Sequence, residues 1–207
     1  MKALKLTILL LACGFMAKAQ PGIMAGWNLN NYQYQLNGVQ QGRGSTPGFN
    51  IGMFYRGSLD RSFVVEPSLA FTRKGAMNTY TAFPIDYYHT RLDYVQLSVP
   101  FMYRAWIDRG MDFTIGAGPF VSVLTHADVI THYANGDQTK GEYAIGTANP
   151  NDFKPMDAGL RFGAGLRFAR TIYLSANYDL GLADVAPQAN TEIRTRTLSL
   201  NLGLMFW

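Results

Sequence analysis

The sequence predicts an all-β chain in which eight antiparallel strands close into an up-and-down transmembrane barrel. Residues 195–207 place an apolar residue at every second position: Leu198, Leu200, Leu202, Leu204 and Phe206. Alternation with period two is typical of a β-strand. The same pattern recurs along the chain, its connections are short and long in turn, and an export signal stands at the N-terminus. Together these observations favour a barrel in an outer membrane.

Each predicted strand has roughly the 9 to 11 residues that a tilted strand needs to cross a bilayer. In chain order the strands cover residues 22–32, 48–56, 62–74, 92–105, 112–124, 157–168, 172–182 and 195–207. Their apolar rows, taken at every second residue, are 23–29, 49–55, 63–71, 95–103, 113–123, 160–168, 172–180 and 198–206. The intervening rows are mainly polar, so each strand has one apolar and one polar face.

The connections alternate in length. Three are only three to six residues long and are typical of hairpin turns: 57–61, 106–111 and 169–171. The other four are long and polar: 33–47, 75–91, 125–156 and 183–194. Short periplasmic turns and long extracellular loops are typical of outer-membrane barrels, and both termini are then periplasmic.

The N-terminus predicts a cleaved secretory signal over residues 1–19 and a barrel domain over residues 20–207. Lys2 and Lys5 precede an apolar core, and Ala17-Lys18-Ala19 supplies the small residues that signal peptidase accepts. The apolar run is shorter than the roughly 20 residues of a transmembrane helix. A transmembrane helix is thus one alternative to the cleaved signal. Lipid attachment at Cys13 is a second alternative, but cleavage there would truncate the apolar core.

Composition excludes several classes of function. Removal of residues 1–19 leaves 15 basic against 14 acidic residues, so the basic character belongs largely to the signal. There is no basic stripe with interleaved aromatic residues, which argues against a nucleic-acid partner. Because the only cysteine is Cys13, the processed chain has neither disulfides nor thiolate metal ligands. We expect no cofactor and no metal.

A soluble β-sandwich is the main alternative to the barrel, since it is also built from alternating strands and turns. A sandwich gives no reason for connection lengths to alternate so regularly. Aromatic residues near the strand ends also fit the interfacial girdles of a membrane barrel, although each could equally be core: Tyr32, Tyr55, Tyr103, Trp106 and Tyr178.

If the apolar rows face lipid, the polar rows face the lumen and place six charged residues there: Arg56, Glu66, Arg104, Arg161, Arg167 and Asp179. The interior of an eight-stranded barrel is just filled by side chains. Unpaired charges in so narrow a space are costly, so these residues should form a plug of ion pairs rather than line a conducting pore.

Catalytic constellations are sparse. Ser122 and His126 are the only Ser/His pair with same-face strand spacing, near the extracellular rim, where outer-membrane lipid hydrolases carry such residues. Four residues of strand separate the two by roughly 13 Å, too far for a direct hydrogen bond. Asn135-Gly136-Asp137 predicts a turn rather than a calcium site, because further oxygen ligands at loop spacing are missing.

Six motifs carry a family resemblance: Gly22-x-x-x-Gly26-x-Asn28, Val64-Val65-Glu66-Pro67-Ser68-Leu69 before Arg73-Lys74-Gly75, Val95-Gln96-Leu97-Ser98-Val99-Pro100, Gly116-Ala117-Gly118-Pro119-Phe120, Asp157-Ala158-Gly159 and Tyr178-Asp179-Leu180-Gly181-Leu182-Ala183-Asp184. With them the chain resembles the PorT-like, or porin-family, outer-membrane β-barrel proteins. The resemblance implies this barrel fold, and one branch of the family is linked to protein secretion. Gln96 departs from it, because related sequences often carry an acidic residue there.

The sequence therefore predicts a non-enzymatic integral protein of the outer membrane in a Gram-negative-type cell. Its long loops would bind an extracellular ligand, or its periplasmic rim would dock an envelope or secretion protein. A small porin-like channel and a lipid-modifying hydrolase are the alternatives. Its other partners are outer-membrane lipid and the barrel-assembly machinery, which we expect to read the last strand through Leu202, Leu204, Phe206 and Trp207.

Overall fold

The computed structural model describes residues 19–37, 39–41, 44–79, 85–147, 152–188 and 190–206. Residues 1–18 of the predicted signal and Trp207 of the predicted assembly signal lie outside this range. Among the described residues, no helix has the length and hydropathy needed to cross a membrane. The strands are β1 Ala19–Leu36, β2 Val39–Gln41, β3 Thr46–Ser58, β4 Phe63–Val65, β5 Ser68–Thr79, β6 Ile85–Ser98, β7 Phe101–Asp108, β8 Met111–Tyr133, β9 Gln138–Glu142, β10 Met156–Phe168, β11 Ile172–Gly181 and β12 Thr191–Met205.

The strands form a closed antiparallel barrel, which confirms the predicted fold. β1 pairs with β12 on one side and with β3 on the other, so the sheet closes on itself. The third crossing is β4 with β5 and the fourth is β6 with β7; each is interrupted at a proline, Pro67 or Pro100. Proline has no backbone N–H to donate to the ladder, which explains why regular pairing stops there. Counted this way, the wall has the eight predicted crossings.

Apolar side chains cover the outside of the barrel wall and polar side chains fill the inside. Leu200 is 55% exposed and Phe162 is 44% exposed, whereas Asn28, Thr114 and Ser122 are fully buried. A sandwich would bury Leu200 and Phe162 between its sheets. The outward apolar rows therefore exclude the sandwich and form the surface that contacts lipid.

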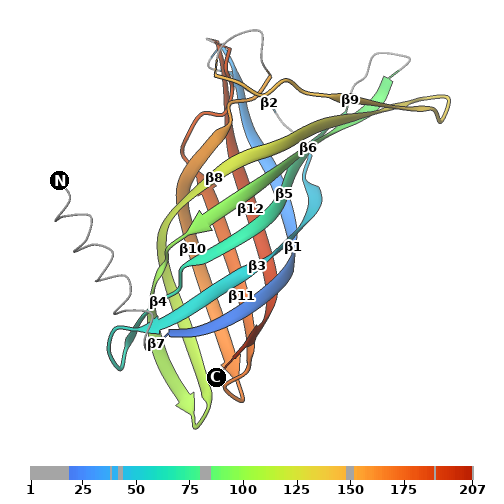
Figure 1. Ribbon diagram of the computed structural model, residues 1–207. Helices are drawn as coiled ribbons and strands as arrows, with labels where there is room; N and C mark the ends of the chain where they lie inside the picture. Colours follow the sequence, from blue (N-terminus) through green and yellow to red (C-terminus); the bar gives the residue numbers. More distant parts are fainter. Residues whose placement is uncertain are drawn as a thin grey trace.

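The two ends of the barrel differ (Figure 1). β4, β7 and the C-terminus lie at the end with short turns, whereas β2 and β9 lie at the opposite end. The short-turn end is periplasmic and the other end is extracellular. There β8 runs on to Tyr133 and forms a hairpin with β9, which projects beyond the wall.

The predicted loops were too long, because several strands continue past the apolar rows. The predicted loop 125–156 begins with nine residues of β8, and the predicted loop 75–91 is shortened from both sides by β5 and β6. Backbone pairing does not require an apolar face, so the ladder continues where the outward residues become polar. The predicted turn at Asn135-Gly136-Asp137 is confirmed: Gly136 has a φ of +89°, and Asn135 Oδ1 accepts the N–H of Asp137 at 3.1 Å.

The predicted aromatic girdle is correct only in part. Tyr103 and Tyr178 are 50% and 40% exposed on the outward rows. Tyr32 is buried inside the barrel, and Trp106 lies at the periplasmic mouth beside Arg104. Both share the parity of the polar row of their strand, which is the reason that they point inward.

Candidate functional site

A cluster of charged residues crosses the lumen near the periplasmic end. Arg56 Nε lies 3.0 Å from Glu66 Oε1, and Arg56 Nη2 lies 2.8 Å from Asp112 Oδ1. Arg167 pairs with the other oxygen of Asp112. The Tyr173 hydroxyl donates to Glu66 Oε2 at 2.8 Å. We call these five residues the periplasmic ion cluster; its two arginines and two carboxylates balance in charge.

Gly165 makes room for the hydroxyl of this cluster. A Cβ atom at this position would lie 2.0 Å from Tyr173 Oη, far inside van der Waals contact. Any larger residue at position 165 would therefore displace the tyrosine from Glu66.

A second network crosses the middle of the barrel. Arg161 Nε and Nη2 donate to the two oxygens of Asp179 at 2.6 and 2.8 Å, a bidentate pair. Gln96 donates to Asp179 Oδ2 at 2.8 Å and accepts from the Ser122 hydroxyl at 3.0 Å. Gln96 thus joins the network through a neutral amide. The cavity at this level has a volume of only about 10 Å³, close to the space of one water molecule.

A buried ion pair lies on the extracellular side of this network. Lys74 Nζ is 3.0 Å from Asp157 Oδ2, and the side chains of both residues are 0% exposed. The Thr195 hydroxyl donates to the same carboxylate oxygen at 2.7 Å. The ammonium group also lies 5.0 Å from the ring centre of Tyr94 and 4.9 Å from that of Phe120.

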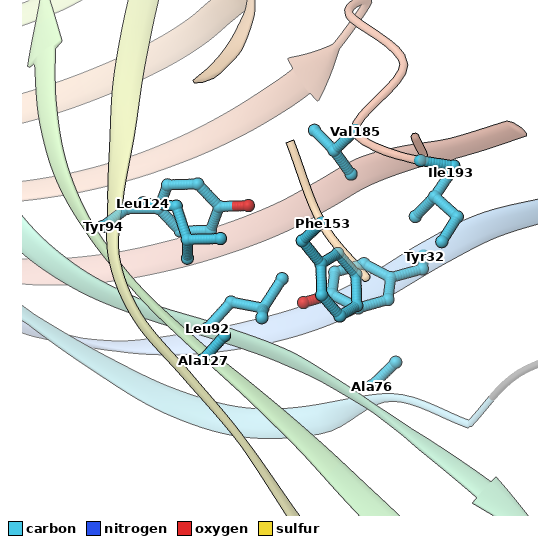
Figure 2. Close-up of a cluster of buried hydrophobic side chains, with 10 residues drawn as sticks. Tyr32, Ala76, Leu92, Tyr94, Leu124, Ala127, Phe153, Val185 and Ile193 are labelled. Atoms are coloured by element: carbon cyan, nitrogen blue, oxygen red, sulfur yellow. The ribbon is translucent and has the colours of Figure 1, made fainter. Parts of the chain in front are cut away.

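An apolar layer closes the extracellular end of the lumen (Figure 2). Side chains of the strands, among them Leu92 and Leu124, surround Phe153 and Val185 from two different loops. Val185 is 0% exposed and Phe153 is 6% exposed. We call this layer the extracellular cap; its buried members are Tyr32, Ala76, Leu92, Tyr94, Leu124, Ala127, Phe153, Val185, Ala186 and Ile193. Both loops lie in regions that the sequence predicted to be polar and extracellular.

One ion pair joins the two loops of the cap. Lys154 Nζ donates to Asp184 Oδ2 at 2.8 Å, and Asp184 Oδ1 accepts the N–H groups of Ala186 and Ile193 at 3.0 and 2.9 Å. Burial alone would raise the pKa of Asp184, but the hydrogen bonds from Lys154 and from these backbone groups outweigh it, so its pKa is lowered. The charged carboxylate therefore stabilises the cap.

We expect acidification to loosen the cap. A pKa that folding lowers gives stability above the unfolded value of 3.8, and this stability is lost as the pH falls through the folded pKa. Hydrogen exchange at Ala186 and Ile193, corrected for intrinsic rates, should be faster at pH 3 than at pH 6. In the Asp184→Asn variant, the corrected exchange at these two amides should be fast at both pH values. An equal dependence on pH in the variant would contradict this role.

The predicted placement of Ser122 and His126 on one face of a strand is wrong. A β-bulge between the pairs of Asp93 and Tyr94 leaves Thr125 unpaired and reverses the facing of β8. Ser122 is fully buried in the lumen, while the side chain of His126 is 48% exposed on the outside. No proton can pass directly between these two side chains.

Arg104 stands apart from the ion pairs. It is buried, and its guanidinium donates to the Ser58 hydroxyl and to the carbonyls of Asp60 and Arg61, at 2.7 to 3.1 Å. It also stacks over the Trp106 ring, 4.7 Å from the ring centre. The structure thus places five of the six predicted lumenal residues in ion pairs, and Arg104 at the periplasmic rim.

Sequence reasoning missed several lumenal residues. Lys74, Asp112 and Asp157 share the parity of the polar rows, so alternation could have identified them as lumenal. Each stands at the end of a predicted strand, where a charged residue is also expected in a turn or loop. Tyr173 has the same parity on β11 and was overlooked because an aromatic residue does not mark a polar face.

The residues of the predicted assembly signal that the structure describes face outward. Leu202, Leu204 and Phe206 are 54%, 43% and 49% exposed. The N–H of Phe206 donates to the carbonyl of Pro21 at 2.8 Å, which continues the pairing of β12 with β1 beyond Met205.

The outer surface changes character toward the extracellular end. Phe71 and Val95 are paired across β5 and β6, and two residues further the pair is Arg73 and Asp93, with N–O distances of 2.7 Å. Beyond this level β6, β8 and β9 form what we call the extracellular sheet, made of residues 85–93, 126–133 and 138–142. The apolar belt therefore ends near Arg73.

The extracellular sheet carries stacked rings. Tyr87 and His132 stack with ring centres 4.3 Å apart, and His89 lies edge-on to His132 at 5.8 Å. Burial, and then the neighbouring His132 and Arg91, lower the pKa of His89. The lowered pKa favours the neutral imidazole.

Comparison with known proteins agrees with this architecture. The profile of the outer membrane protein beta-barrel domain family matches residues 16–186. None of the curated proteins compared with the chain matches it.

Several solved structures are similar to the chain at low sequence identity. Ail, the attachment invasion locus protein of Yersinia pestis, solved with the heparin analogue sucrose octasulfate, is 16% identical with a TM-score of 0.43, over 91% of this chain and 99% of that one. Neisserial surface protein A is 14% identical with a TM-score of 0.49, over 91% and 99%. OprG of Pseudomonas aeruginosa is 11% identical with a TM-score of 0.48, over 91% and 97%. The family match covers more than half of the chain, and the outward apolar rows agree with it. The chain therefore belongs to the outer membrane protein beta-barrel domain family and is an integral protein of the outer membrane.

Proposed function

We propose that this protein is a non-enzymatic binding protein, which contacts other molecules at the ends of its barrel and does not move solutes through it. The observation that supports this proposal most strongly is the filled lumen. The periplasmic ion cluster, the central network around Arg161 and the extracellular cap lie one above another. Side chains just fill the interior of an eight-stranded barrel, so three such layers leave no continuous path along it.

The extracellular sheet is the surface that best fits a binding role. Paired strands extend it beyond the wall, so its exposed side chains are held on a rigid support. Lys140 and Asp128 are paired at 3.0 Å on this sheet, beside the stacked rings of Tyr87 and His132. A mixture of charged and aromatic side chains suits a polar partner outside the cell.

The filled lumen argues against a channel, and the positions of Ser122 and His126 argue against a lipid hydrolase. A channel needs a continuous aqueous path, whereas the layers leave a central cavity of about 10 Å³. A lipid hydrolase needs a nucleophile and a base in contact, whereas Ser122 and His126 lie on opposite faces of the wall.

Two measurements test this proposal. In planar bilayers the purified protein should give no conductance steps; regular steps would overturn the claim of a sealed lumen. Cross-linking of intact cells should then compare the wild type with a variant in which an Asn-Gly turn replaces residues 131–139. A partner recovered only with the wild type supports binding by the extracellular sheet, and identical sets of cross-linked proteins contradict it.

Recognition by the barrel-assembly machinery stays a prediction for the last strand. Deletion of Phe206 and Trp207 should sharply lower the amount of folded protein in the membrane, because it removes the aromatic end of the outward row. Heat-modifiable migration of membrane fractions on gels measures this amount. A deletion of the same size at Asn135-Gly136, in the projecting turn, is the control. Equal yields for both deletions would contradict the prediction.

The narrower PorT-like resemblance is also part of this proposal. It supports a periplasmic partner of the envelope or of protein secretion, which would reach the short-turn end of the barrel.

A further inference from the structure

A cavity of about 610 Å³ lies at the periplasmic mouth of the barrel. Its deepest residues are Arg56 and Arg167 of the periplasmic ion cluster. Its rim comes from Gln20, the end of β3, and the turns between β7 and β8 and between β10 and β11. We call it the periplasmic vestibule; its lining residues include the arginines Arg56, Arg104, Arg109, Arg167 and Arg170.

The vestibule carries an excess of positive charge. Arg56 and Arg167 are balanced by Glu66 and Asp112 behind them. Among the other lining residues, Arg104, Arg109 and Arg170 carry positive charges and Asp108 carries a negative charge. Outside the periplasmic ion cluster, the lining therefore has two more positive than negative side chains, in a concave site where the field of like charges is concentrated.

Arg104 is the strongest sign that an anion belongs here. It is only 7% exposed, and the groups that accept its hydrogen bonds are a hydroxyl and two backbone carbonyls, all neutral. The carboxylates of Asp112 and Asp60 attract it, but neither forms an ion pair with it, and a buried charge that lacks a directly paired opposite charge is costly. The Trp106 ring supports it from one side and faces Arg167 as well, at 5.6 Å.

The deep end of the vestibule also presents unused donors. The Nη1 of Arg56 and the Nε of Arg167 are buried and lack a hydrogen-bond partner among the described residues. The side chain of Arg56 is 2% exposed, so bulk water does not readily replace that partner. Both side chains line the cavity, so guanidinium groups with unsatisfied hydrogen-bonding capacity form its deep end.

We propose that the periplasmic vestibule binds a compact, multiply charged oxyanion carried by a molecule of the periplasm. Guanidinium groups match the oxygens of phosphates and carboxylates in bidentate geometry. A double negative charge would balance the wall, and the volume admits a small head group but not a folded chain. This proposal is independent of binding by the extracellular sheet.

Titration calorimetry of the detergent-solubilised protein with pyrophosphate and with citrate tests the proposal, with chloride at equal ionic strength as the reference. Arg109→Gln and Arg170→Gln each remove one charge from the rim and leave the periplasmic ion cluster intact. Each should weaken binding by about tenfold, as the loss of one charge-assisted hydrogen bond implies. Arg91→Gln, on the extracellular sheet, should bind like the wild type. Heat-modifiable migration checks that every variant is folded.

The two probes distinguish which class of anion, phosphate or carboxylate, binds in the vestibule. Binding of pyrophosphate alone supports a phosphate-bearing molecule, binding of citrate alone supports a carboxylate-bearing one, and binding of both supports the shared chemistry. Binding of neither probe would overturn the proposal. It would also fail if the double variant Arg109→Gln/Arg170→Gln bound as tightly as the wild type. None of these outcomes depends on conductance or on the extracellular sheet.

Discussion

Replacing Asp112 with asparagine should destabilise the barrel by about 3–5 kcal/mol, the usual cost of breaking a buried ion pair from one side. Asp112 is fully buried and pairs with both Arg56 and Arg167. The amide keeps the shape of the carboxylate but not its charge. Glu66 would remain the charged partner of Arg56, whereas Arg167 would have no charged partner and would keep neutral contacts such as its hydrogen bond to Gln20 at 3.1 Å. Two largely buried guanidinium groups would then share one carboxylate.

The loss is measured as a drop in the temperature at which the heat-modifiable, folded form disappears in detergent. Asp86→Asn provides the matched control, because Asp86 is exposed on β6 and should tolerate the same change. A melting temperature of Asp112→Asn within error of the control would show that the periplasmic ion cluster does not stabilise the barrel. Arg161→Leu and Arg167→Leu should lower the same temperature, since the first leaves Asp179 without its ion-pair partner and the second leaves Asp112 with Arg56 alone.

The pair of Lys74 and Asp157 should give the strongest coupling in the protein. Asp157→Asn leaves a fully buried ammonium group, and Lys74→Met leaves a carboxylate held only by Thr195. Each single change should cost about 3–5 kcal/mol. The double variant should be more stable than either single variant, because methionine and asparagine leave no charge and the amide still accepts from Thr195.

The pair of Lys140 and Asp128 is the control for this double-mutant cycle. Its N–O distance is also 3.0 Å, but the side chain of Lys140 is 60% exposed. Coupling there should not exceed about 1 kcal/mol, as is usual for pairs in contact with water. Equal coupling in the two cycles would mean that the lumen around Lys74 is hydrated, contrary to the buried geometry.

Most of the fold follows from the parity of the side chains. Alternation assigns the outward rows because a strand has a strict period of two, and lipid imposes an apolar face wherever the wall touches it. The same parity turns Glu66, Arg161 and Asp179 inward. The strand ends were less predictable, since pairing continues past Arg73 and Asp93 without an apolar row to mark it.

Features that depend on distant contacts could not be predicted. The bulge at Thr125 moves His126 to the outside, yet no residue in that stretch marks a bulge. The pairing of Lys74 with Asp157 joins positions 83 residues apart and depends on the stagger of the strands. Phe153 and Val185 stand in polar loops, so nothing local indicates that those loops fold into the barrel mouth.

The central claim is that the apolar row of each strand contacts acyl chains while the polar row is enclosed. Because residues 20–207 contain no cysteine, spin labels can be placed one at a time at Leu198, Ser199, Leu200, Asn201 and Leu202 in reconstituted bilayers. Collision with oxygen, which concentrates in lipid, should be high at 198, 200 and 202 and low at 199 and 201. Uniform accessibility along the strand, or contact of position 200 with a water-soluble relaxing agent, would contradict the account.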